Sequence, residues 1–227
     1  MEKRTLHRAG AICAGLGAIV TGVSYGVHPE LAEAAAFLPI VAGSSRFADI
    51  HWGLIIGMVL MQFGFGAVTL TLREQPERND AGGWAQLGLY TLLVGLTLWI
   101  GVFVTEVALK PLADGLRTDP ALTGGARALA GLVDAGGTAA TFVYWLGVAL
   151  LGTALLISRR YPRWMGAIGL VLGAVISLGI GLPRAFLGQS AWTEKIGFPI
   201  LAFATLVWTL VLGVMLWRLE GAGQGRR

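Results

Sequence analysis

Residues 84–108 read WAQLGLYTLLVGLTLWIGVFVTEVA, a stretch in which Glu106 is the one residue with a charged side chain. An α-helix rises about 1.5 Å per residue, so about 20 apolar residues cross the roughly 30 Å hydrocarbon core of a membrane. The apolar residues here form a continuous run, whereas they alternate with polar residues in the strands of a membrane β-barrel. The stretch therefore predicts a transmembrane helix.

Five further stretches share this character. The predicted spans are residues 10–27, 52–72, 84–108, 138–157, 164–182 and 196–217. Over the whole chain, 55% of the residues are hydrophobic and 13% are charged, against about 25% charged in soluble domains. The mean hydropathy is +0.70. These values exclude a soluble globular enzyme and a disordered chain. We predict an all-α, polytopic membrane protein with a single six-helix transmembrane domain over residues 1–227.

The positions of the basic residues predict how the chain crosses the membrane, because cytoplasmic loops are enriched in Lys and Arg. With the N-terminus inside, 11 of the 17 basic residues fall on the inner side. They are Lys3, Arg4, Arg8, Arg73, Arg78, Arg159, Arg160, Arg163, Arg218, Arg226 and Arg227. Both termini are therefore predicted to be cytoplasmic, in a bacterial inner membrane. The pI near 9.6 then reflects this orientation, and no nucleic-acid partner is expected.

Two longer connections are predicted on the outer side, at residues 28–51 and 109–137. The first contains PELAEAAAFL at residues 29–38, which is typical of a short amphipathic helix on the membrane surface. The second is interrupted by Pro111 and Pro120, with a short helix expected at residues 126–134. We expect the two interfacial helices to cap the outer ends of the spans.

Glycines recur at a four-residue spacing in three of the spans. The pairs are Gly22 with Gly26, Gly53 with Gly57, and Gly169 with Gly173. Such pairs let the backbones of two helices approach closely within a membrane. They predict tight packing inside the bundle or, alternatively, a homodimer or a contact with another membrane protein through the glycine-rich faces.

Polar residues gather at the outer ends of the spans. Near the midplane the strongest polar side chain is Gln62, expected to bond to a neighbouring helix, and no ionisable group lies there. Proton relays and ion pumps need buried charges, so their absence argues against both. We therefore predict a cavity that opens outward and binds a lipophilic or amphipathic small molecule or a lipid. Its predicted residues are Tyr25, Trp99, Phe103, Glu106, Trp145 and Arg184, with His28 and His51 at its mouth.

The two outer histidines also raise the question of a cofactor. His28 ends the first span and His51 opens the second, so both lie at one depth, where a bis-histidine haem or a metal ion is geometrically possible. No C-x-x-C-H or H-E-x-x-H motif supports either, and Cys13 is the sole cysteine. Two alternatives to ligand binding follow: a non-catalytic, haem-bearing subunit of a larger membrane complex, or a small transporter. If the protein is an enzyme, Glu106, His28 and His51 are the candidate acid–base groups.

A resemblance is carried by the sequence ISRRYPRW at residues 157–164, which is followed by Gly169 within an apolar span. Here the chain resembles a bacterial family of six-helix membrane proteins known as a domain of unknown function (DUF4386-like). The resemblance continues through residues 199–217 and in the order of the helical hairpins. It implies a six-helix fold and supplies no activity, cofactor or site residue.

Overall fold

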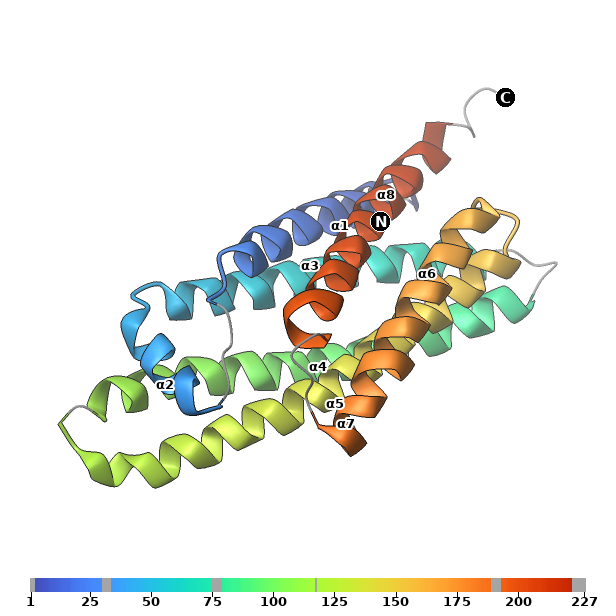
Figure 1. Cartoon of the computed structure of the whole chain (residues 1–227). Coiled ribbons are helices and arrows are strands. Elements are labelled where there is room, and N and C mark those ends of the chain that lie inside the picture. The colour runs from blue at the N-terminus through green and yellow to red at the C-terminus, as the bar shows by residue number, and fades with distance from the viewer. Residues whose placement is uncertain (1–2, 30–33, 75–78, 117, 189–192, 222–227) are drawn as a thin grey trace.

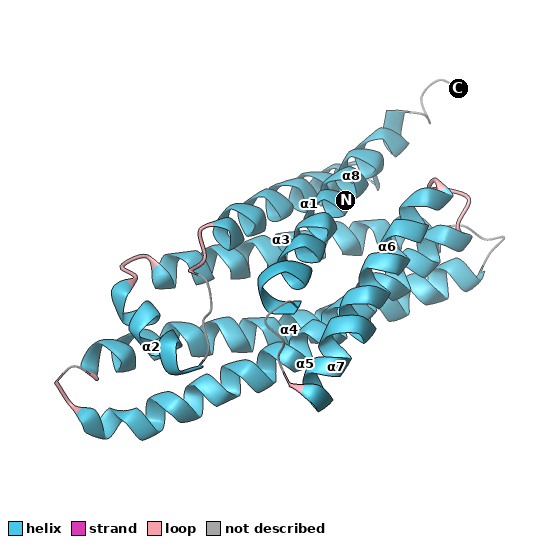
Figure 2. Ribbon diagram, viewed as in Figure 1, coloured by secondary structure: helices cyan, strands magenta, loops and turns pink. Residues whose placement is uncertain are grey.

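The computed structural model describes residues 3–29, 34–74, 79–116, 118–188 and 193–221, which are mostly helical, with short loops and no strand among them (Figure 2). The helices are α1 (Lys3–Gly26), α2 (Ala34–Gly43), α3 (Phe47–Arg73), α4 (Asn79–Gly115), η1 (Pro120–Leu122), α5 (Thr123–Ile157), α6 (Arg163–Ile176), η2 (Ser177–Gly181), α7 (Leu182–Leu187), η3 (Thr193–Gly197) and α8 (Phe198–Gly221). Among the described residues, six helical segments are long and apolar enough to cross a membrane. The prediction of an all-α chain with six such segments is confirmed.

The long helices pack around a ring (Figure 1). In order, α1 contacts α3, α3 contacts α4, α4 contacts α5, α5 contacts α6, α6 contacts α8, and α8 returns to α1. Since successive helices are antiparallel, α1 begins and α8 ends at one end of the bundle, which we call the termini end. The opposite end, where α2 lies, is the distal end.

Most of the glycines predicted to mediate packing are used within the chain. A Cβ atom on Gly57 would lie 2.7 Å from the backbone nitrogen of Thr21, and one on Gly53 would strike Ser24, so α1 and α3 pack with their backbones close together. Gly169 faces Trp208, and Gly173 faces Ala149. The close approach of these helices stands in for the hydrophobic driving force that is missing in lipid. A homodimer through glycine-rich faces stays a prediction.

The second outer connection differs from its prediction. The α4 helix continues beyond residue 108 to Gly115, and α5 already begins at Thr123, so the helix expected at residues 126–134 is part of α5. The reason is tertiary packing: Leu109 and Ala113 on α4 bury against Val41 and Phe47 in a small second core under α2. These contacts outweigh the helix-breaking tendency of Pro111.

The described part of the first long connection contains a helix at a different position from the predicted one. The prediction spans residues 29–38, of which residues 30–33 lie outside the described residues. The observed helix is α2, Ala34–Gly43. Its placement on a membrane surface stays a prediction.

Candidate metal site

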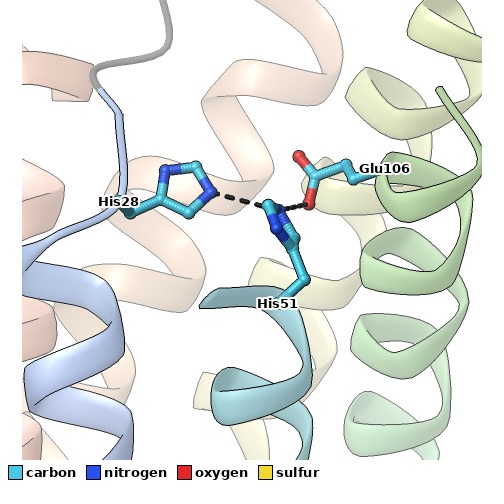
Figure 3. Close-up of side chains that lie close together, drawn as sticks. All are labelled: His28, His51 and Glu106. Carbon is cyan, nitrogen blue, oxygen red and sulfur yellow. Dashed lines mark hydrogen bonds and ion pairs between the residues drawn. The ribbon is translucent and has the colours of Figure 1, made fainter. Parts of the chain in front are cut away.

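Three side chains from three parts of the ring meet at the distal end (Figure 3). His28 follows the end of α1, His51 lies near the start of α3, and Glu106 lies on α4. The first two share a depth because α1 and α3 are consecutive antiparallel helices. Glu106 reaches the same level because it comes 27 residues after the first residue of α4, about 40 Å along the helix axis.

His51 lies within hydrogen-bonding distance of each of the other two groups. The Nε2 atom of His51 lies 3.2 Å from the Nε2 atom of His28 and 2.9 Å from the Oε2 atom of Glu106. One potential ligand atom from each residue falls within 4.8 Å of the other two. His51 is fully buried and Glu106 is 3% exposed, while His28 is partly buried. The cluster is therefore largely shielded from solvent.

Hydrogen bonds to the backbone determine which nitrogen of each imidazole carries a proton. The Nδ1 atom of His51 lies 2.6 Å from the carbonyl oxygen of Phe47, and the Nδ1 atom of His28 lies 2.9 Å from that of Pro29. A carbonyl oxygen only accepts hydrogen bonds, so each Nδ1 must be the donor. In a neutral imidazole the other nitrogen then carries a lone pair. Two Nε2 lone pairs and a carboxylate oxygen thus point at one small volume.

Such an arrangement calls for a cation. The Nε2 atom of His51 is this close to two other acceptors, the Nε2 atom of His28 at 3.2 Å and the Oε2 atom of Glu106 at 2.9 Å, and such atoms repel unless a proton or a metal ion lies between them. Burial lowers the pKa of His28 below its usual value, and the neighbouring His51 lowers it further, whereas Glu106 acts in the opposite direction. Neutral His28 is the form that ligates metals.

Aromatic rings hold the site in place. The ring of Phe47 lies against that of His51, with centroids 4.2 Å apart, and the ring of Phe103 meets His51 edge-on at 5.9 Å. Phe47 is fully buried beneath α2. Phe47 therefore accepts a hydrogen bond from the Nδ1–H group of His51 with its carbonyl oxygen and packs on the imidazole with its ring.

The donor geometry fits a metal ion better than a haem. With Zn–N bonds of 2.0–2.1 Å, two nitrogens of a tetrahedral site lie about 3.3 Å apart, and the two Nε2 atoms here lie 3.2 Å apart. A bis-histidine haem places its porphyrin plane between the two nitrogens. Nitrogens at hydrogen-bonding distance leave no room for that plane, so the haem hypothesis for His28 and His51 does not match this geometry.

Three of the predicted aromatic residues form a series of ring contacts that starts at His51 with Phe103. Phe103 stacks on Trp99 with centroids 5.2 Å apart, and Trp99 meets Trp145 edge-on at 6.4 Å. Tyr25 packs against the same core. The sequence prediction grouped these residues with His28, His51 and Glu106, and the structure also places them in one continuous region.

Several buried polar atoms of the bundle have no hydrogen-bond partner among the described residues. They are the Nε1 atom of Trp99, the hydroxyl of Tyr144 and both amide atoms of Gln62. The expectation that Gln62 bonds to a neighbouring helix is therefore wrong for the described part of the chain. In hydrocarbon each unpaired polar group costs several kcal/mol, so these atoms are natural partners for water or for a polar group of a ligand.

Arg184 lies apart from the cluster. Its guanidinium bonds Asp134 of α5 at 2.6 Å. The two residues help to line a cavity of about 480 Å³ between α5 and α7, together with Phe142, Leu182 and Phe186. The residues predicted to line one binding cavity therefore belong to two sites, with Arg184 in one and His28, His51 and Glu106 in the other.

The sequence did not reveal that His28, His51 and Glu106 converge. The available signals were the shared depth of the two histidines and the isolation of Glu106 in an apolar span. An acid in such a position is a functional candidate, but pairing it with the histidines requires knowing that α3 and α4 are neighbours. Lys110, one turn further along α4 than Glu106, forms an ion pair with Asp114 at 2.6 Å.

Comparisons with protein families, with characterised proteins and with solved structures find no match for the chain. The resemblance at residues 157–164 therefore stays a prediction. The observations that bear on function are therefore those of the site formed by His28, His51 and Glu106.

Proposed function

We propose that this chain is an integral membrane metalloprotein that binds one divalent transition-metal ion through His28, His51 and Glu106. The observation that supports it is the convergence of two imidazole lone pairs and a carboxylate oxygen in a buried volume. In the proposed topology both termini are in the cytoplasm of a bacterial inner membrane, which places the site toward the outer face.

The donor set limits the kind of ion. Imidazole nitrogens suit zinc, copper, iron and nickel, and a carboxylate oxygen is compatible with zinc and iron. Two histidines and one glutamate are the protein ligands of several catalytic zinc sites, in which a water molecule takes the fourth position. The backbone bonds of His28 and His51 supply the outer support that fixes metal-binding tautomers.

The proposal gives the candidate acid–base residues a different role. As ligands, His28, His51 and Glu106 would hold the ion and leave a coordination position open. An ion at such a position lowers the pKa of bound water and polarises a carbonyl or phosphoryl oxygen. Metal-assisted hydrolysis is therefore the class of reaction that this arrangement supports best if the protein is an enzyme.

Metal analysis of the purified protein tests the proposal. We expect about one equivalent of zinc or iron per chain after purification without chelator, and cobalt substitution should produce visible d–d absorption. His51→Ala should abolish both signals. His7→Ala is the matched control, because His7 is also buried on α1 but lies toward the termini end. Equal metal content in the two variants, or none in the wild type, would overturn the proposal.

A second candidate function is the binding of a lipophilic or amphipathic molecule inside the ring. It is favoured by the unpartnered, buried polar atoms of Trp99, Tyr144 and Gln62, the first two of which lie against other aromatic rings. Native mass spectrometry of the purified protein tests it: a bound small molecule that is lost in Gln62→Leu supports it, and an adduct-free wild type contradicts it.

A further inference from the structure

Three arginines lie at the junction of α5 and α6 at the termini end: Arg159 and Arg160 in the connection and Arg163 at the start of α6. They differ in their contacts. One of them, Arg160, donates to the backbone carbonyl of Thr71 at 2.9 Å and pairs with Glu74 at 3.5 Å. Next to it, the hydroxyl of Tyr161 bonds the Thr71 hydroxyl at 2.8 Å, and Tyr161 is 3% exposed. These bonds attach the connection firmly to the end of α3.

The other two arginines, Arg159 and Arg163, are exposed and line a cavity of about 470 Å³. Leu156, Ile157, Ser158 and Tyr161 complete its lining, and among the described residues none of the lining is acidic. The cavity thus combines two positive charges with apolar and hydroxyl-bearing walls. Because Tyr161 and Arg160 are bonded to the end of α3, the backbone that carries Arg159 and Arg163 is held in place.

An exposed apolar face of α6 begins at Trp164, the residue after Arg163. Trp164, Ile168, Val171 and Val175 are between 42% and 58% exposed. Their spacing places them on one face of the helix. A molecule with an anionic head and an apolar tail matches both parts: the head fits between the arginines, and the tail follows α6 into the membrane.

We propose that Arg159 and Arg163 bind the headgroup phosphate of one anionic phospholipid, whose acyl chains lie along α6. This site is independent of the proposed metal site at the other end of the bundle. In the proposed topology it faces the cytoplasmic leaflet. Inorganic phosphate shares the headgroup chemistry, but it lacks the chains that would use the exposed face of α6.

Native mass spectrometry with added lipid tests the site. Full-length protein in detergent would be titrated with phosphatidylglycerol, with phosphatidylcholine and with inorganic phosphate. We expect one phosphatidylglycerol to be retained about tenfold or more tightly than phosphatidylcholine, because each basic residue near an anionic lipid strengthens binding severalfold. Phosphate should compete only weakly. Equal retention of the two lipids, or phosphate binding without lipid preference, would overturn the proposal.

Matched variants test whether Arg159 and Arg163 cause the preference for phosphatidylglycerol. Arg159→Gln combined with Arg163→Gln should abolish the preference. Arg73→Gln combined with Arg218→Gln removes the same charge from exposed positions at the same end and should preserve it. Should the first double variant fail to fold, Arg159→Lys with Arg163→Lys keeps the charge and should retain most of the preference. A preference that survives in the first double variant, or that both glutamine pairs lose equally, contradicts the assignment.

Discussion

The two ends of the bundle use ionisable residues in opposite ways. At the distal end His51 and Glu106 are buried, and the Nε2 atom of His51 lies 2.9 Å from the Oε2 atom of Glu106. At the termini end Arg159 and Arg163 are exposed beside a cavity. A buried ionisable group must have a partner, since removal from water costs several kcal/mol. An exposed arginine keeps its hydration. We therefore expect substitutions at the distal end to affect both stability and ligand, and those at the termini end chiefly the ligand.

The largest effect is expected from Glu106→Ala. It removes the carboxylate that pairs with the buried His51 through a proton or a metal ion, and breaking a buried pair in this way costs about 3 kcal/mol or more, roughly 10 °C in Tm. Bound metal should be lost as well. Thermal unfolding in detergent and metal analysis measure the two effects.

Glu106→Gln is the companion variant, because it keeps the shape of the side chain and its ability to hydrogen-bond while removing the charge. It should lose metal affinity and retain most of the thermal stability. If both variants leave Tm and metal content unchanged, the distal cluster is not the polar centre that we describe.

A smaller effect is expected from acidification of the metal-free protein. Burial depresses the pKa of His28 in the folded state below the usual 6.5, so on acidification the unfolded chain takes up a proton before the folded chain does. The stabilising contribution is present above pH 6.5 and is lost as the pH falls through the folded pKa. Tm in the presence of chelator should therefore drop more between pH 7.5 and 5.5 in the wild type than in His28→Gln. Identical pH profiles would show that His28 does not titrate in this way.

The smallest effect is expected from Tyr161→Phe at the termini end. It removes one hydrogen bond to Thr71, whose hydroxyl still bonds the carbonyl of Val68 at 2.7 Å. A net loss of about 1 kcal/mol, or roughly 3 °C in Tm, is expected. Metal content should be unaffected. A loss as large as that of Glu106→Ala would erase the contrast between the two ends.

Much of the helical architecture could be predicted from local sequence. Each predicted span lies within a continuous helical segment or overlaps one closely, although the span at residues 164–182 runs through α6, η2 and the start of α7. A run of apolar residues long enough to cross a membrane is helical whatever its neighbours are. The ends of the helices were harder to place. Pro111 indicated a break, yet α4 continues past it, since Leu109 and Ala113 gain contacts with Val41 and Phe47.

The candidate site could be predicted only as a collection of polar residues at one depth. Arg184 belongs by sequence to the same level as Glu106, but it bonds Asp134 elsewhere on the ring. Depth along a helix follows from counting residues. Position around the bundle depends on which helices are neighbours, and no local pattern records that.

The sequence by itself determined that the chain forms six apolar helices, that its few charges lie toward their ends, and that His28, His51 and Glu106 reach a common level. Hydropathy and helical rise are local properties, so they can be obtained from the residues alone. Only the tertiary structure decided that α1, α3 and α4 stand side by side at that level, and that Phe47 and Pro29 fix the imidazole tautomers with their carbonyl oxygens. Convergence of three lone pairs is a property of packing between helices, and packing depends on the whole chain at once.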